Sequence, residues 1–248
     1  MLNLTSAQWV LAVMGAAGIG VSKSGFSGVS MLHVLVFAFL FGARESTGIV
    51  LPMLVVGDIL AVIAFRQHAR WDYIRRVLPP AVIGIVCGTF MMQRLPDGAF
   101  RPVIGIIILF LSALQLLRLL RPALFERVPH HLWFAWAMGL LAGVTTMLAN
   151  AAGPIMALYL LAVALPKYEL VGTSAWLFLI INILKLPFSL ALGLIHPNSL
   201  LLNAVLIPAV ALGLVIGRWC VARVSQRIFD VMLLGFASLA ALRLVGAF

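Results

Sequence analysis

The sequence predicts an all-α, polytopic helical membrane protein built from two inverted repeats, each with a broken-helix hairpin plus three spans. The first observation is composition: of 248 residues, 64% are hydrophobic and 10% are charged, which is more apolar surface than a water-soluble domain can bury. The second is a series of apolar runs, each close to the ~20 residues that cross a bilayer as a helix. The third is that glycines and prolines of one half recur in the other. We therefore expect a single integral membrane domain over residues 1–248, with repeats at 1–125 and 126–248.

Six uninterrupted apolar runs are each long enough to cross a membrane with some tilt. The runs are 47–65, 77–93, 100–120, 173–194, 199–217 and 229–247. The N-terminus lacks a positively charged segment and a small-residue cleavage site, so we expect no cleaved signal peptide. The sequence therefore predicts a multi-pass protein that keeps its first hydrophobic segment.

Two further hydrophobic regions, 9–41 and 132–165, are longer than one span and are interrupted midway. The first break is the polar, glycine-containing segment 22–28, and the second is the segment 149–154, which contains Gly153 and Pro154. Backbone freed by such a break is tolerated at membrane depth only where protein or a watery cavity satisfies it. Each region is therefore predicted to form a hairpin of two short helices.

The two halves of the chain align on one another through glycine and proline. Gly18 and Gly28 match Gly143 and Gly153 at a spacing of 125 residues. A second set matches at a spacing of 129, with Pro79, Gly84 and Gly88 falling on Pro208, Gly213 and Gly217. These matches predict an internal repeat, and the Gly-x-x-x-Gly pairs within them are typical of close helix-packing faces.

Arginine in the loops predicts the orientation of the halves, because Lys and Arg are retained on the cytoplasmic side. Loops 66–76 and 118–131 are basic and belong inside, which leaves 94–101 outside. In the second half the pattern is reversed, since 196–198 has no fixed charge and 218–227 carries three arginines. Inverted repeats predict this reversal if each hairpin enters and leaves on one side, and both termini are then outside.

The formal net charge of +10 is explained by the same loops, which face anionic lipid. We therefore expect membrane lipid as a partner and no nucleic acid. Cys87 and Cys220 lie in separate apolar stretches without metal-ligand spacing, so both are expected to be small core residues. No cofactor is predicted, and the sequence does not determine an oligomeric state.

Charged residues inside spans are costly and therefore candidates for function. Asp58 and Lys185 lie near the middle of two spans, and at a spacing of 124 Asp58 falls on Asn182, one helical turn from Lys185. We expect Asp58 and Lys185 to pair; the alternative is a structural ion pair with no transport role. Lys23 lies in the first break, where a buried lysine needs a counter-charge or a bound anion. The alternative interpretation is that the Lys23 side chain extends to a nearby surface.

The breaks also supply hydroxyl, amide and backbone N–H groups that suit an anion, because half-helix ends present unsatisfied N–H groups. Each hydroxyl has the alternative of bonding a carbonyl of its own helix. The predicted substrate-binding residues are Lys23, Ser24, Gly25, Ser27, Gly28, Thr145, Thr146, Asn150, Gly153, Asn182 and Lys185. Asp58 is the predicted carrier of a coupling proton, and no catalytic residue or metal ligand is predicted.

The segment Val171-Gly172-Thr173-Ser174-Ala175-Trp176, followed by Asn182, Lys185 and Pro187, resembles the TauE/SafE sulfite exporter family. The first half is similar too, with a glycine-rich break, a span and a basic loop carrying Arg66, Arg70, Trp71 and Asp72. The resemblance runs over nearly the whole chain. It implies a permease of the bacterial inner membrane that moves small sulfur-containing anions such as sulfite or sulfonates, with coupling to the proton gradient.

Two alternatives to a transporter remain. Gly25-Phe26-Ser27-Gly28 fits the Gly-x-Ser-Gly motif of rhomboid intramembrane proteases, with Ser27 as nucleophile. That chemistry needs a histidine base from another span, whereas His68, His130, His131 and His196 lie in or beside loops and His33 lies in the same hairpin. We therefore expect no enzyme.

A membrane accessory protein without cargo is the second alternative, but it gives no reason to bury Lys23, Asp58 and Lys185. We expect alternating access, with a small anion held near the midplane where the hairpin tips meet.

Overall fold

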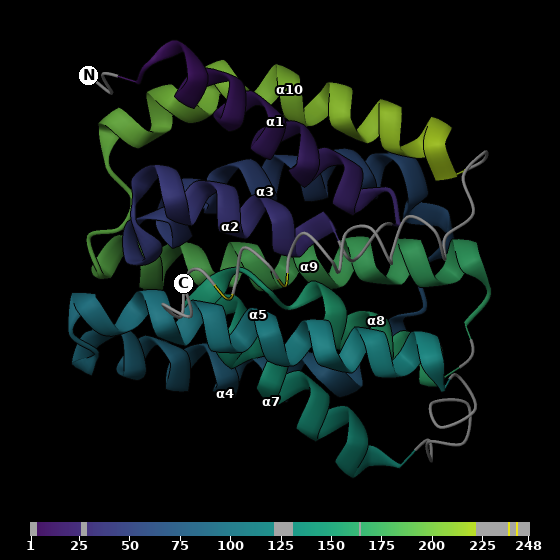
Figure 1. Cartoon of the computed structure of the whole chain (residues 1–248). Helices are drawn as coiled ribbons and strands as arrows, with labels where there is room; N and C mark the ends of the chain where they lie inside the picture. The colour runs from purple at the N-terminus through teal and green to yellow at the C-terminus, as the bar shows by residue number, and fades with distance from the viewer. Residues whose placement is uncertain are drawn as a thin grey trace.

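The computed structural model describes residues 4–25, 29–121, 131–163 and 165–221, with residues 238 and 242 as single positions. Within these residues the chain forms helices and no strand, which confirms the predicted all-α class (Figure 1). The helices are α1 (Ser6–Lys23), α2 (Val29–Phe41), α3 (Ala43–Phe65), α4 (Trp71–Arg94), α5 (Asp97–Leu120), α7 (Leu132–Ala149), α8 (Gly153–Ala162), α9 (Lys167–Ala191) and α10 (Pro197–Val221).

Both long hydrophobic regions form two helices around a break, as predicted. Beyond α1 the backbone turns at Gly25, whose φ of +117° is accessible to glycine at little cost. α7 ends at Asn150, which adopts the left-handed conformation with φ 52° and donates its backbone N–H to the carbonyl of Thr146. α7 has 18 residues and is long enough to span a membrane by itself, whereas α8, after the break, has 10 residues.

The two hairpins enter the molecule from opposite ends (Figure 1). α1 begins and α2 ends at the left of the view, whereas α7 begins and α8 ends at the right. α3, α4, α5, α9 and α10 coincide with five of the six predicted runs. The sixth run, 229–247, lies outside the described residues. An opposed pair of hairpins is what an inverted repeat requires, and the repeat itself stays a prediction.

The paired glycines of the two halves lie where helices approach most closely. A Cβ added at Gly84 would collide with the carbonyl oxygen of Leu140 in α7, and one added at Gly213 would collide with that of Ala17 in α1. α4 therefore packs backbone to backbone on α7, and α10 packs in the same way on α1. The predicted packing role of the Gly-x-x-x-Gly segments is confirmed, and each contact joins one half to the other.

The central helices α3 and α9 also contact one another in a mirrored way. A Cβ at Gly48 would collide with Leu194, in the turn after α9. A Cβ at Gly172, the residue that matches Gly48 at a spacing of 124, would lie 2.7 Å from the carbonyl oxygen of Phe65, at the end of α3. The start of each central helix thus packs on the end of the other.

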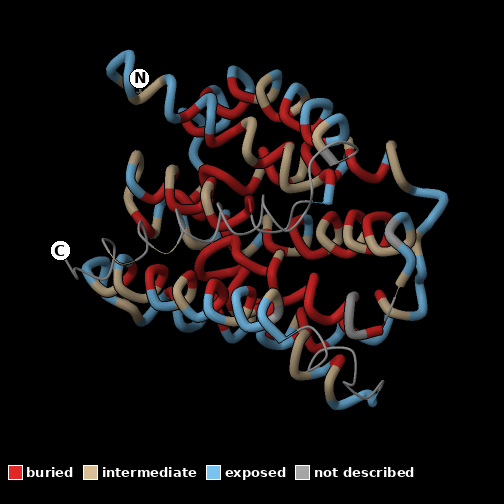
Figure 2. The backbone as a smooth tube through the Cα atoms, turned by 45° about the vertical axis from the view of Figure 1, so that its right-hand side comes forward, coloured by how far each residue is buried: buried red, intermediate tan, exposed pale blue. Residues whose placement is uncertain are grey.

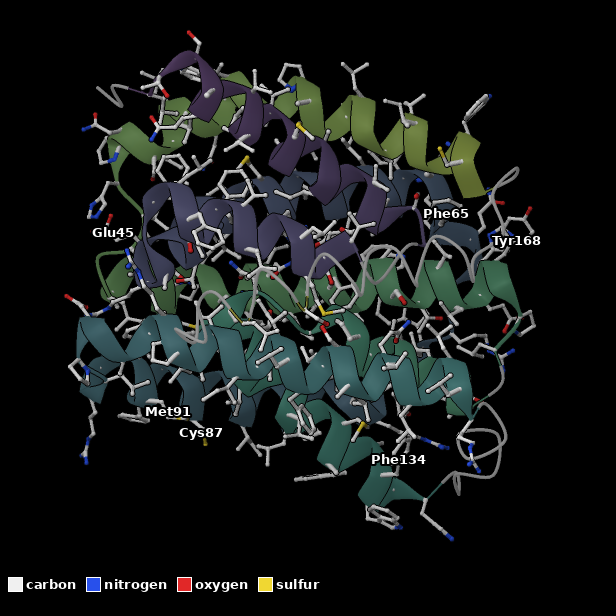
Figure 3. The ribbon with its side chains drawn as sticks, in the orientation of Figure 1. Glu45, Phe65, Cys87, Met91, Phe134 and Tyr168 are labelled. Atoms are coloured by element: carbon white, nitrogen blue, oxygen red, sulfur yellow. The ribbon has the colours of Figure 1, made fainter. Side chains whose placement is uncertain are left out.

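Basic residues gather at one end of the helical bundle. Figure 3 places Phe65 and Tyr168 together at the right of the view and Glu45 at the left. At the right end the guanidinium of Arg218 lies 5.5 Å from the Phe65 ring, and Arg70 pairs with Glu169 at 3.2 Å. Arg70 of the first half and Arg218 of the second therefore lie at the same end, as the charge pattern requires. Residues 122–130 and 222–227 of the other predicted basic loops lie outside the described residues. Which end faces the cytoplasm stays a prediction.

Buried residues line the inner faces of the helices, and the outer faces carry exposed residues (Figure 2). Many of the exposed side chains are large and apolar, such as Met14, Ile63 and Leu212, which suits contact with lipid. Cys87 is exposed and points outward from α4 in Figure 3. The expectation that Cys87 is a core residue was wrong, because it lies on the outer face of α4, away from Gly84 and Gly88.

Candidate functional site

The carboxylate of Asp58 lies at the centre of the bundle, on α3. Its side chain is 0% exposed, and a buried carboxylate is costly unless its oxygens are paired. Oδ1 lies 2.6 Å from Nζ of Lys23, and Oδ2 accepts a 2.6 Å hydrogen bond from Nδ2 of Asn182 in α9. Asp58 therefore contacts one helix of the first hairpin through an ion pair and the opposite central helix through a hydrogen bond.

Lys23 is the last residue of α1 and extends inward rather than to a surface. Its side chain is 10% exposed, and Nζ also lies 4.9 Å from the centre of the Phe178 ring. The Lys23 stem passes beside Gly57 of α3, since a Cβ added there would lie in ordinary van der Waals contact, 3.5 Å from Cγ of Lys23. The alternative in which Lys23 reaches a nearby surface was wrong, because Asp58 offers a counter-charge inside the protein.

Lys185, on α9, is 1% exposed and is bonded to neutral groups. Nζ donates to Oδ1 of Asn150 at 2.5 Å and to Oγ1 of Thr146 at 3.2 Å. The predicted direct pair between Asp58 and Lys185 was wrong. Lys185 lies one turn beyond Asn182 and is directed at the end of α7, while the carboxylate is occupied by Lys23 and Asn182. Lys185 nevertheless interacts electrostatically with both Lys23 and Asp58.

Asn150 links the two halves at the tip of the second hairpin. Its Nδ2 donates to the carbonyl oxygen of Thr47 in α3 at 2.9 Å, which directs its Oδ1 toward Lys185. The left-handed backbone at Asn150 ends α7 and turns the side chain into the bundle. A residue that terminates a helix therefore also orients the ammonium group of Lys185.

Several predicted site residues have other partners or lie elsewhere. The hydroxyls of Ser24 and Thr145 donate to the carbonyls of Val21 and Leu141 on their own helices, which is the alternative considered from the sequence. Gly25 forms the turn after α1, and Gly153 begins α8. Ser27 and Gly28 lie outside the described residues. The structure thus brings together Lys23, Asp58, Asn182, Lys185, Asn150 and Thr146.

His33 is a buried histidine beside the site that the sequence analysis did not place among the candidate site residues. This α2 residue is 1% exposed, and in the described part of the chain neither ring nitrogen has a hydrogen-bond partner. It packs near Gly18 of α1 and interacts electrostatically with Lys23. Its position within an apolar helix was the available signal, because a histidine at that depth is costly unless it has a polar contact.

The site is thus two ammonium groups and one carboxylate at the junction of both hairpins and both central helices. Among the described residues no group of three or more His, Cys, Asp or Glu side chains could hold a metal ion. The site is suited to binding a small anion through ammonium, amide and hydroxyl donors.

Comparison with known proteins gives one match. The family model described as Sulfite exporter TauE/SafE matches residues 10–244 of the chain. No curated protein and no solved structure matches. The matched range includes both hairpins, α3, α9 and all six residues of the site.

Proposed function

We propose that this chain, which belongs to the TauE/SafE sulfite exporter family, is a secondary transporter. Its proposed substrates are small sulfur-containing anions such as sulfite or organosulfonates. The family and the six apolar, membrane-length helices in the described ranges make it a multi-pass membrane transporter. We place it in the inner membrane of a bacterium, as the resemblance implies. The cargo, the route of transport and the coupling to protons are the parts proposed here.

The bonding of Lys185 is the observation that carries this proposal. An ammonium group buried without a counter-charge is costly, and within the described residues Lys185 has only amide and hydroxyl oxygens as hydrogen-bond partners. An anion at this position would supply the missing negative charge. Asn150 and Thr146 could then reorient toward the bound anion, since both already contact Nζ of Lys185.

The arrangement of helices supports alternating access. The hairpins enter from opposite ends and their tips reach the central charged groups, α1 through Lys23 and α7 through Asn150. Each hairpin is held by close glycine contacts to a span of the other half. A relative movement of these packed units around the central site would expose it to one side and then the other.

Asp58 is the proposed carrier of the coupling proton. It is the one carboxylate among the described residues that contacts a central ammonium group, that of Lys23, and its charge holds Lys23. If the carboxylate is protonated, Lys23 loses its partner and becomes available to the substrate. Protonation and anion binding are therefore linked through a single ammonium group.

We propose no catalytic role. A rhomboid-like mechanism at Ser27 needs a histidine from another span, and among the described residues outside the first hairpin, His68, His131 and His196 all lie beyond the ends of the spans. A non-transporting accessory protein is the remaining alternative, and it gives no reason for a buried lysine with neutral partners.

Uptake of radiolabelled sulfite into proteoliposomes, with and without an imposed pH gradient, tests the proposal. We expect saturable uptake that exceeds that of protein-free liposomes, responds to the gradient and is reduced by excess methanesulfonate. The accessory role would be favoured if correctly inserted protein took up neither sulfite nor the two other anions tested, a sulfonate and sulfate.

A further inference from the structure

The charged groups of the central site do not cancel. Among the described residues, three charged side chains lie together inside the bundle: Lys23, Asp58 and Lys185. Lys23 and Asp58 are joined at 2.6 Å and form a neutral pair. Lys185, counted as an ammonium group, has neutral hydrogen-bond partners in the described part of the chain. With His33 neutral, the site therefore has one positive charge in excess.

We infer that this single excess charge determines the charge of the cargo: permanent monoanions bind with Asp58 ionised, whereas dianions bind only together with a proton on Asp58. The inference rests on the proposed function and defines its substrate class. A monoanion beside Lys185 brings the buried site to neutrality without any change at Asp58. A dianion leaves one negative charge in excess, and a buried excess charge is strongly disfavoured.

The bonding of Asp58 shows where the proton would go. Oδ2 accepts from Asn182, and this bond can persist in the neutral acid. Oδ1 is the oxygen held by Lys23, so it is the oxygen that takes the proton from solution when the ammonium group leaves. Lys23 already interacts electrostatically with Lys185 and can join it on the second negative charge of the anion.

The charged and polar groups that interact with Asp58 come from two elements, α1 and α9. α1 contributes Lys23, and α9 contributes Asn182 and Lys185. On α2, His33 is the additional titratable group near Lys23. The experiments below include the variant His33→Gln, which has no imidazole. A proton that this variant still takes up cannot be bound by His33 and is assigned to Asp58.

The test measures binding and proton uptake by the purified full chain in detergent at neutral pH, with methanesulfonate as a permanent monoanion and thiosulfate as a dianion. Titration calorimetry in buffers of different ionisation enthalpy counts the protons. For the native chain we expect methanesulfonate to bind without proton uptake and thiosulfate to bind with uptake of one proton. His33→Gln is expected to keep both results.

Charge variants sharpen the test. Asp58→Asn raises the excess charge by one unit, so thiosulfate is expected to bind without proton uptake, and the ratio of thiosulfate to methanesulfonate affinity is expected to rise about 30-fold or more. The double variant Lys23→Met/Asp58→Asn restores the native excess charge without a carboxylate, so it should bind methanesulfonate and lose thiosulfate. The double variant is also a control for folding, because it removes both partners of the pair.

The results separate the two levels of the proposal. Proton-free thiosulfate binding by the native chain, or an unchanged affinity ratio in Asp58→Asn, would overturn the charge rule and leave anion transport intact. If sulfite, methanesulfonate and thiosulfate all fail to bind the folded native chain, the proposed function fails, and the charge rule fails with it.

Discussion

Replacing Lys185 by methionine should abolish anion binding without weakening the fold. Lys185 is buried and donates to two neutral oxygens, those of Asn150 and Thr146. Methionine is unbranched and can follow the path of the lysine stem. The substitution removes a buried ammonium group that has no hydrogen-bonded counter-ion among the described residues, so we expect it to carry little cost to the folded protein.

Replacing Lys185 by methionine is expected to change anion affinity much more than the stability of the fold. Truncating one partner of a buried charge pair costs binding about 2 to 5 kcal/mol, which corresponds to a loss of affinity of about 30-fold to several thousandfold. Two hydrogen bonds from an ammonium donor are lost, each with a net value of about 1.5 to 3 kcal/mol. Removal of the buried charge offsets this loss, because replacement of buried ionic groups by apolar ones is often neutral or stabilising. We therefore expect a melting temperature equal to or above that of the native chain.

The assay combines thermal unfolding in detergent with uptake of radiolabelled sulfite into proteoliposomes, scaled to the amount of inserted protein. Arg44→Met is the matched control, because Arg44 pairs with Asp97 at an exposed end of the bundle and such pairs contribute little. Sulfite uptake by Lys185→Met at the native rate would refute the assignment of Lys185 to the anion. A large fall in its melting temperature, with poor insertion, would show instead that Lys185 is structural.

Three further predictions concern the neighbours of Lys185 and the helix contacts. Lys23→Met should lower stability by about 3 to 5 kcal/mol, because it strands the buried carboxylate of Asp58; addition of Asp58→Asn should recover most of the loss in a thermal melt. Asn150→Asp should place a carboxylate 2.5 Å from the Lys185 position and compete with substrate, so we expect strongly reduced sulfite uptake with unchanged insertion, and native uptake would argue against an anion at Lys185. Gly213→Leu should prevent α10 from packing on the backbone of Ala17 and reduce the yield of folded protein by size-exclusion chromatography, whereas Gly98→Ala, where no heavy atom lies within 4 Å of the added Cβ, should leave the yield unchanged.

Much of the fold was predictable because the bilayer imposes its own length scale on the sequence. Apolar runs of about 20 residues mark the spans, so α3, α4, α5, α9 and α10 were placed to within a few residues. The breaks at Gly25 and Asn150 were visible as polar interruptions of longer apolar regions. The glycine pairs at 84 and 88 and at 213 and 217 were correctly interpreted as packing faces, because a missing side chain permits close backbone approach wherever the partner lies.

The candidate site was predictable in its members but not in its bonds. Lys23, Asp58, Asn150, Asn182 and Lys185 were all selected from the sequence, since each is a polar residue at membrane depth. The contact between Asp58 and Asn182, residues matched at a spacing of 124, follows from the crossing of α3 and α9 near the centre. The sequence did not show that Asp58 pairs with Lys23 and not with Lys185.

The sequence by itself determined the class, the spans, the breaks and the depth of each charged residue, because hydropathy and helix rise are local properties. Only the tertiary structure decided which charges meet. Depth in the membrane leaves open the direction in which each side chain points around its helix, and that direction is set by packing between helices. The tip of α1 lies beside Gly57, so Lys23 reaches Asp58. The end of α7 lies beside Lys185, so in the described part of the chain its ammonium group bonds to neutral oxygens in the middle of the protein.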